Sequence, residues 1–241
     1  MPYVRPTFFG IAYASRLFRQ QDYQSTYQAF SDATSPLDFT NASHAEALRT
    51  WLNQWGCRIS KQKPISRTLA IWARNWVARL PHRSLRNLFE ADIELLGSAY
   101  WELRNNLLGP AAAAKAIFAL KPETAIPWDQ AIRDGLGLKD NRDGYPEMLR
   151  RSQKEANFLV EDASELGISE SDIPKEIGSP GRTLARLLDE YHWITLTQGH
   201  QIPSVKDLKL WLSWECPPAV STKRADNRGK RIESTVSQET D

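Results

Sequence analysis

Apolar residues recur along this chain with the period of an α-helix, and this pattern restricts the fold more than any other feature. Between residues 65 and 80 they are spaced by three or four positions: Ile65, Leu69, Trp72, Trp76 and Leu80. No alternation of period two extends beyond four residues, and the run 193–197, which could form a strand, has no second strand to pair with. We predict one all-α domain over residues 1–215, without a sheet of three or more strands.

Helix boundaries follow from capping residues, glycines and prolines. Ser43 and Glu46 match a capping box that opens a helix, and Gly97 is expected to weaken or divide the helix that contains it. Further helices are predicted at 110–120, 127–136, 147–166, 181–194 and 205–214. The acid-rich helix 147–166 is expected to be a solvated surface. The Trp residues at 51, 55, 72 and 76 have the spacing of a buried face.

The end of the chain differs in composition from the rest. Residues 216–241 contain no aromatic side chain, include Pro217-Pro218, and carry a basic cluster between Lys223 and Arg231. Such a segment cannot bury enough apolar surface to offset its chain entropy. We therefore predict a disordered tail over 216–241 that is dispensable for folding.

Composition and the cysteine count exclude several classes of protein. No stretch approaches the roughly 18 apolar residues of a membrane helix, and the first 21 residues lack the features of a signal peptide. Cys57 and Cys216 are too few for a disulfide framework or a zinc site, and the four His show no metal-ligand spacing. We expect a cytoplasmic protein with reduced thiols, no membrane contact, no metal and no cofactor. The oligomeric state cannot be predicted from these features.

Charge is distributed unevenly, and the segment 47–89 contains no Asp or Glu. It carries nine basic residues: Arg49, Arg58, Lys61, Lys63, Arg67, Arg74, Arg79, Arg83 and Arg86. Basic residues interleaved with aromatic ones are typical of nucleic-acid surfaces, because cations neutralise phosphates and rings stack on bases. Arg67 and Arg74 are seven residues apart and share a helix face away from the apolar stripe. They are our candidate phosphate contacts; the alternative is a solvated face with no partner.

A second pattern lies between residues 99 and 136. A helix is expected to end at Gly109, and Pro110 then opens an alanine-rich helix whose small residues at 111–114 allow close packing. Twenty residues after Gly109, Asp129 follows Pro127-Trp128 at the head of the next helix.

These residues and their spacing resemble the helix-hairpin-helix DNA glycosylase superfamily. The resemblance implies an all-helical fold in which a hairpin grips a DNA phosphate through backbone N–H groups at a helix N-terminus. It places the phosphate at Gly109, Ala111 and Ala112, with Lys115 one turn later. It assigns Asp129 as the catalytic acid that stabilises an oxocarbenium ion or orients water. The partner would be double-stranded DNA with a base flipped into a pocket, for which Trp128 and Tyr100 are candidate stacking residues.

Two departures from the family pattern refine this expectation. The hairpin reads Asn105-Asn-Leu-Leu-Gly109 instead of Leu-Pro-Gly-Val-Gly, so either it is reshaped or its register is shifted toward Asn105 or Asn106. Ala111 stands where lyase-competent members carry a nucleophilic Lys. The resemblance therefore implies at most a monofunctional, base-excision repair hydrolase that forms no Schiff base.

Two other functions stay open at this point. The chain could be a non-catalytic helical module that binds nucleic acid or an acidic protein through the basic 47–89 surface. It could also be a helical adaptor with no nucleic-acid role. Under either alternative, Asp129 is only a first-turn acid favoured by the helix dipole and near Arg133 at i+4.

Overall fold

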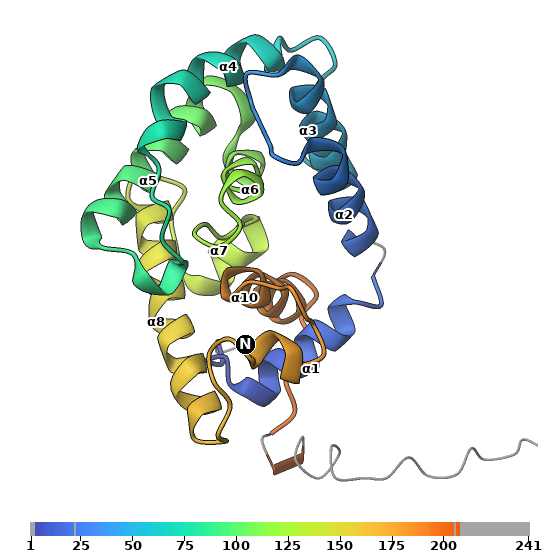
Figure 1. The fold of residues 1–241 in the computed structure, drawn as a ribbon, viewed down its shortest axis with the longest axis vertical. Helices are drawn as coiled ribbons and strands as arrows, with labels where there is room; N and C mark the ends of the chain where they lie inside the picture. The colour runs from blue at the N-terminus through green and yellow to red at the C-terminus, as the bar shows by residue number, and fades with distance from the viewer. Residues whose placement is uncertain (1–2, 22, 205, 208–241) are drawn as a thin grey trace, which may run out of the picture.

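The computed structural model describes residues 3–21, 23–204 and 206–207, and this part of the chain is helical with no strand (Figure 1). The helices are α1 (Phe8–Phe18), α2 (Tyr23–Thr34), α3 (Ala42–Gln54), α4 (Ile65–Trp76), η1 (Val77–Arg79), η2 (Leu85–Asn87), α5 (Glu90–Leu103), η3 (Arg104–Leu108), α6 (Pro110–Leu120), α7 (Gln130–Leu136), α8 (Gly144–Ser164), α9 (Ile173–Glu176), α10 (Leu184–His192) and η4 (Trp193–Thr197). The all-α prediction is confirmed. The predicted tail, and the helix expected at 205–214 apart from 206–207, lie outside the described residues.

Helix α6 forms the middle of the fold, and the other helices surround it in Figure 1. Every residue from Ala112 to Phe118 is buried, including Lys115. The alanines make this possible, because small side chains let neighbouring helices approach the backbone closely. On one side α6 contacts α3, and on the other it contacts α5. The residues that start α6 are therefore fixed by the core of the domain.

The predicted tryptophan stripe is largely buried, as expected. Trp51 and Trp72 are buried, whereas Trp55 and Trp76 are partly exposed at its ends. Trp72 donates a hydrogen bond from Nε1 to the backbone carbonyl of Ala99 (2.9 Å), which ties α4 to α5.

Several local expectations are corrected by the structure. The N-cap of α3 is Asn41, whose side chain accepts a hydrogen bond from the Ser43 backbone N–H (2.9 Å), so Ser43 lies inside the helix. The run 193–197 is not a strand but the π-helix η4, which continues α10. Gly97 does not divide α5, which extends unbroken from Glu90 to Leu103.

Gly97 instead allows α5 and α8 to pack closely. A Cβ atom built on Gly97 would lie 2.3 Å from Cγ of Pro146, well inside van der Waals contact. We expect Gly97→Ala to lower the free energy of unfolding by about 1–3 kcal/mol, the usual effect of overpacking. Urea denaturation measures this difference. Pro146→Ala, which removes the clashing atoms, should recover much of the loss in the double variant, whereas equal stability of Gly97→Ala and wild type would contradict the packing argument.

Helix α8 is not the fully solvated surface that its acidic residues suggest. Glu155 is buried, and its carboxylate accepts hydrogen bonds from the Tyr3 hydroxyl (2.6 Å) and Arg151 Nε (3.1 Å), and contacts His192 Nε2 (2.9 Å). Burial alone would raise the pKa of Glu155, but His192, Tyr3 and Arg151 together hold this pKa below its ordinary value. This cluster joins the N-terminal segment to α8 and α10.

Candidate functional site

The turn between α5 and α6 is built from a π-helix and one glycine. Residues Arg104–Leu108 form η3, after which Gly109 adopts φ +75° and ψ 172°. The positive φ explains why a glycine is needed at this position. Gly109 N–H donates to the carbonyl of Arg104 (3.1 Å), which closes the turn before Pro110 begins α6. The turn between α5 and α6 therefore consists of η3 followed by Gly109, where its positive φ lies.

The start of α6 presents backbone donors. The first i→i−4 hydrogen bond of the helix is donated by Ala113 to Gly109 (3.0 Å), so the N–H groups of Ala111 and Ala112 precede the helical ladder. The Ala111 side chain is partly exposed, whereas the Ala112 side chain is buried against the core. Ala112 can therefore take part in binding through its backbone only.

Asp129 is the N-cap of α7, and both of its carboxylate oxygens have fixed partners. Oδ1 accepts a hydrogen bond from the backbone N–H of Ile132 (2.9 Å), and Oδ2 accepts one from the Thr197 hydroxyl of η4 (3.0 Å). Each oxygen keeps a second lone pair. Within the described residues Arg133 forms no ion pair with Asp129; its guanidinium lies over the Trp128 ring, 5.3 Å from the centroid.

A group of buried aromatic residues holds the loop that precedes Asp129. Trp128 and Tyr100 are both fully buried, and Trp128 Nε1 donates to the Tyr100 hydroxyl (3.2 Å). The Tyr145 hydroxyl donates to the carbonyl of Ile126 (3.0 Å). The expectation that Trp128 and Tyr100 line a base pocket is therefore corrected. Their rings are packed in the core, where no ligand reaches them, and they position Asp129 indirectly.

Asp129 and Ala111 line one cavity of about 290 Å³ at the surface, although 18 positions separate them in the sequence. The other lining residues come from the end of α3, from α6 and from η4: Trp55, Gly56, Cys57, Lys115, Trp193, Thr197 and Gln198. This volume is at the lower end of the range for small-molecule pockets. Its walls combine aromatic rings with a carboxylate, an ammonium, a hydroxyl and an amide, which is the mixture that a polar planar ligand requires.

Sequence analysis identified Asp129, Ala111 and Lys115 but missed the remaining walls of this cavity. Trp55 was assigned to the core stripe, and Trp193 and Thr197 to a possible strand. Their contribution depends on the approach of α3 and η4 to the start of α6, and no local sequence signal marks that approach.

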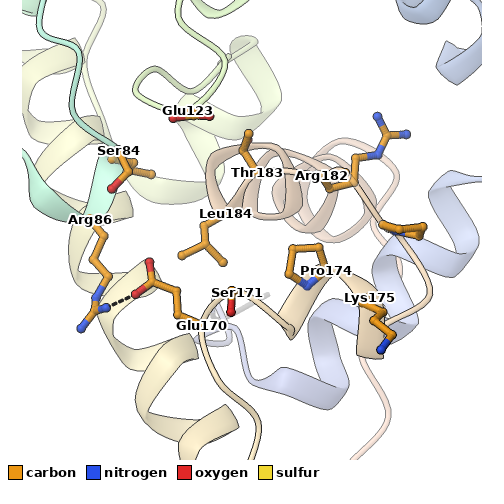
Figure 2. Close-up of a pocket in the computed structure, with 13 residues that line it drawn as sticks. Ser84, Arg86, Glu123, Glu170, Ser171, Pro174, Lys175, Arg182, Thr183 and Leu184 are labelled. Carbon is orange, nitrogen blue, oxygen red and sulfur yellow. Dashed lines mark hydrogen bonds and ion pairs between the residues drawn. The ribbon is translucent and has the colours of Figure 1, made fainter.

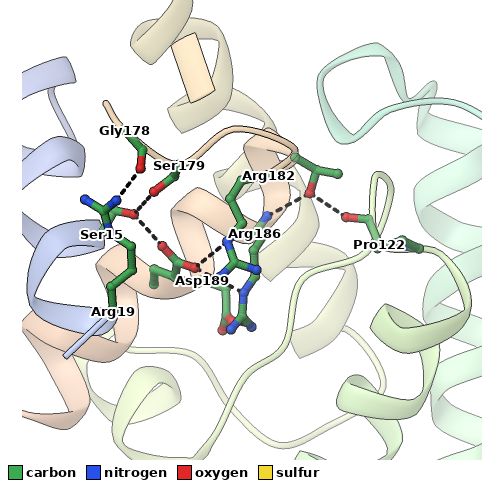
Figure 3. Close-up of polar contacts among 10 residues, drawn as sticks. Ser15, Arg19, Pro122, Gly178, Ser179, Arg182, Arg186 and Asp189 are labelled. Carbon is green, nitrogen blue, oxygen red and sulfur yellow. Dashed lines mark hydrogen bonds and ion pairs between the residues drawn. The ribbon is translucent and has the colours of Figure 1, made fainter. Parts of the chain in front are cut away.

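A cluster of buried charges surrounds Arg186, and Figure 3 shows Arg186 with Asp189 and Ser15. Arg186 forms ion pairs with Asp189 (2.7 Å) and Glu190 (3.3 Å), and Glu190 accepts a hydrogen bond from the Ser15 hydroxyl (2.7 Å). Burial raises the pKa of Asp189 to about 6, although Arg186 and Lys115 oppose the shift. Burial also raises the pKa of the Cys57 thiol, against the opposing effect of Lys115.

A second surface cavity, of about 470 Å³, is shown in Figure 2. At its edge Arg86 forms an ion pair with Glu170, and Thr183 and Leu184 from the start of α10 form another wall. None of the candidate site residues predicted from the sequence lines this cavity.

The basic residues of the acid-free segment 47–89 fall into two groups: some are bound to other parts of the chain, and others are exposed. Arg49 is buried and donates to the carbonyls of Ser60 and Lys63, while Arg83 and Arg86 pair with carboxylates elsewhere in the chain. Arg67 and Arg74 are exposed on α4 and do not line the cavity that contains Asp129.

No helix in the described part of the chain is long and apolar enough to span a bilayer. No group of three or more His, Cys, Asp and Glu side chains in this part of the chain has a metal-binding arrangement.

Comparison with known proteins gives no relative: no family model, no curated protein and no solved structure matches this chain.

Proposed function

We propose that the protein binds DNA at the start of α6 and hydrolyses an N-glycosidic bond in the cavity beside it. The observation that carries this proposal is that Asp129 and Ala111 share one cavity with Trp55 and Trp193. The helix-hairpin-helix resemblance requires these two positions to face one another, and they line the same cavity. The enzyme class is thus supported by geometry as well as by spacing.

DNA would be held by its backbone at the hairpin. The N–H groups of Ala111 and Ala112 lie at the positive end of the α6 dipole, a favourable location for a phosphate oxygen. The Cα atom of Gly109 carries no side chain, which leaves the backbone accessible. A nucleotide held there would have its sugar next to the cavity mouth and its base rotated inward.

The carboxylate of Asp129 suits the charge that develops during the reaction. As the C1′–N bond breaks, its electron pair leaves with the base and positive charge forms on the sugar. A fixed carboxylate stabilises that charge more in the transition state than in the ground state. Water then adds to C1′, loses a proton to solvent, and the departing base takes up a proton. The hydrogen bonds from Ile132 and Thr197 hold the carboxylate in place without neutralising it.

The direct test is base release by the full chain. Duplexes with one deaminated, oxidised, alkylated or mismatched base are incubated with the protein, and abasic sites are detected by alkaline strand cleavage. We expect release from at least one class of lesion. No release from any duplex would contradict the hydrolysis, while retained DNA binding would favour the binding-module alternative.

The alternative, a non-catalytic nucleic-acid-binding module, is favoured by the exposure of Arg67 and Arg74 on α4. If both cations contact phosphates, Arg67→Ala and Arg74→Ala should each weaken binding to all sequences and reduce the salt slope by about one. Fluorescence anisotropy between low and moderate salt measures this slope. Arg142→Ala, an exposed residue outside the acid-free segment, is the matched control and should leave the slope unchanged. Affinity indifferent to both α4 substitutions would exclude this face as a DNA contact.

A further inference from the structure

Lys115 stands out in the cavity because it is a buried cation without a counter-charge in contact. Its side chain is only 8% exposed. Within the described residues it forms no ion pair and no hydrogen bond; its ammonium lies over the Trp55 ring, 4.9 Å from the centroid. The Nζ atom itself is open to the cavity, so a ligand that supplied a hydrogen-bond acceptor there would form a charge-assisted hydrogen bond with it.

Lys115 lines two cavities of very different size among the described residues. One, of about 10 Å³, is shared with Arg186 and Asp189 and has space for about one water molecule. The other is the cavity of about 290 Å³ that also contains Asp129. A ligand in the larger cavity can therefore contact the ammonium.

The chemistry of this wall selects a class of base. An ammonium is a donor only, with no acceptor capacity. The Asp129 carboxylate, the Thr197 hydroxyl and the Gln198 amide also line the cavity and can accept hydrogen bonds. At Lys115 itself, a ring carbonyl oxygen can accept a hydrogen bond from the ammonium, whereas a ring amino group would place a second donor against it.

We propose that Lys115 is the specificity-determining residue of this site and that it selects bases carrying a carbonyl group, such as the deaminated base hypoxanthine, over amino-substituted bases. This inference rests on the proposed function for the entry of a base into the cavity, but it does not require hydrolysis. Lys115 is predicted to donate a hydrogen bond to the carbonyl oxygen, and the same contact would stabilise negative charge on a departing base.

The test uses binding without turnover. Duplexes of one sequence carry hypoxanthine or adenine at a single position, on a 2′-fluoroarabino sugar that resists hydrolysis. We expect the wild type to bind the hypoxanthine duplex at least about tenfold more tightly than the adenine duplex, since a charge-assisted hydrogen bond of this kind contributes one decade or more. Lys115→Met should reduce this preference to within about twofold.

Stability separates this specificity role from a structural one. Lys115→Met keeps the length of the side chain and its packing over Trp55, so it should leave Tm within about 3 °C of the wild type. Lys139→Met, at an exposed position, is the matched control and should change neither Tm nor base preference. A larger fall in Tm for Lys115→Met would show that the lysine holds the fold together and would overturn the proposal.

Other outcomes assign failure to one proposal or the other. A wild type that binds both duplexes equally, or a Lys115→Met variant that keeps the preference, overturns the role of Lys115. Inorganic phosphate at millimolar concentration that abolishes the preference, without weakening binding of the adenine duplex, would make the site a simple anion site and also overturn it. A chain that prefers hypoxanthine but releases no base contradicts the hydrolysis alone. A chain that binds no duplex at low salt contradicts both proposals.

Discussion

Asp129→Asn is expected to slow base release by about 100- to 1000-fold while the affinity for DNA stays level or improves. Loss of one fixed electrostatic group that stabilises a transition-state charge has this magnitude. Asparagine is an equally good N-cap, and its amide oxygen can keep one of the contacts to Ile132 and Thr197. The variant therefore differs from wild type chiefly in charge. Single-turnover release from a lesion duplex, with anisotropy for affinity, measures both quantities.

Asp134→Asn provides the control, because Asp134 is an exposed acid on the same short helix. It should release base at the wild-type rate. The opposing hypothesis treats Asp129 as a first-turn acid without function. Under that hypothesis both substitutions would change stability by a few tenths of a kcal/mol and leave any catalytic rate untouched.

Ala111→Lys is expected to convert the protein into one that forms a covalent DNA adduct. The new side chain would enter the cavity that Ala111 shares with Asp129. Its amine would attack C1′ as the C1′–N bond breaks and the base leaves with the electron pair. After the amine loses a proton and the sugar ring opens, the resulting imine would be reduced to a stable amine by borohydride. The wild type has no amine at position 111, so its adduct should be absent.

Denaturing gel electrophoresis after borohydride treatment detects this adduct. Ala119→Lys places the same side chain near the other end of α6 and should give no adduct, which controls for non-specific trapping. A folded Ala111→Lys protein that binds the lesion duplex and forms no adduct would show that position 111 does not face the sugar.

The all-α fold was predictable because the spacing of apolar residues in the local sequence is enough to specify most of its helices. The stripe through Ile65, Leu69 and Trp72 and the apolar run of α6 specify helices by periodicity alone, and both are buried. The errors lie where tertiary contacts override local signals. The sequence suggests that Gly97 breaks a helix, but the structure shows that it leaves space for Pro146. The sequence also suggests that Glu155 is solvated, but its carboxylate is buried against His192.

The candidate site was only half predictable. Asp129, Ala111 and Lys115 lie in one continuous segment, so their spacing carries information about their geometry. Trp128 and Tyr100 do not line the cavity, because the Trp128 ring points into the core, away from the neighbouring Asp129, and contacts Tyr100 of α5 there. The walls formed by Trp55, Trp193 and Thr197 come from distant segments, and only the folded chain brings them to Asp129.

The most direct measurement is a crystal structure of Asp129→Asn bound to a duplex that contains a releasable lesion. The account predicts the lesion base inside the cavity between Trp55 and Trp193, C1′ next to residue 129, and a phosphate at the N–H groups of Ala111 and Ala112. DNA bound along Arg67 and Arg74 on α4, with the lesion still stacked in the duplex and the cavity empty of DNA, would contradict it.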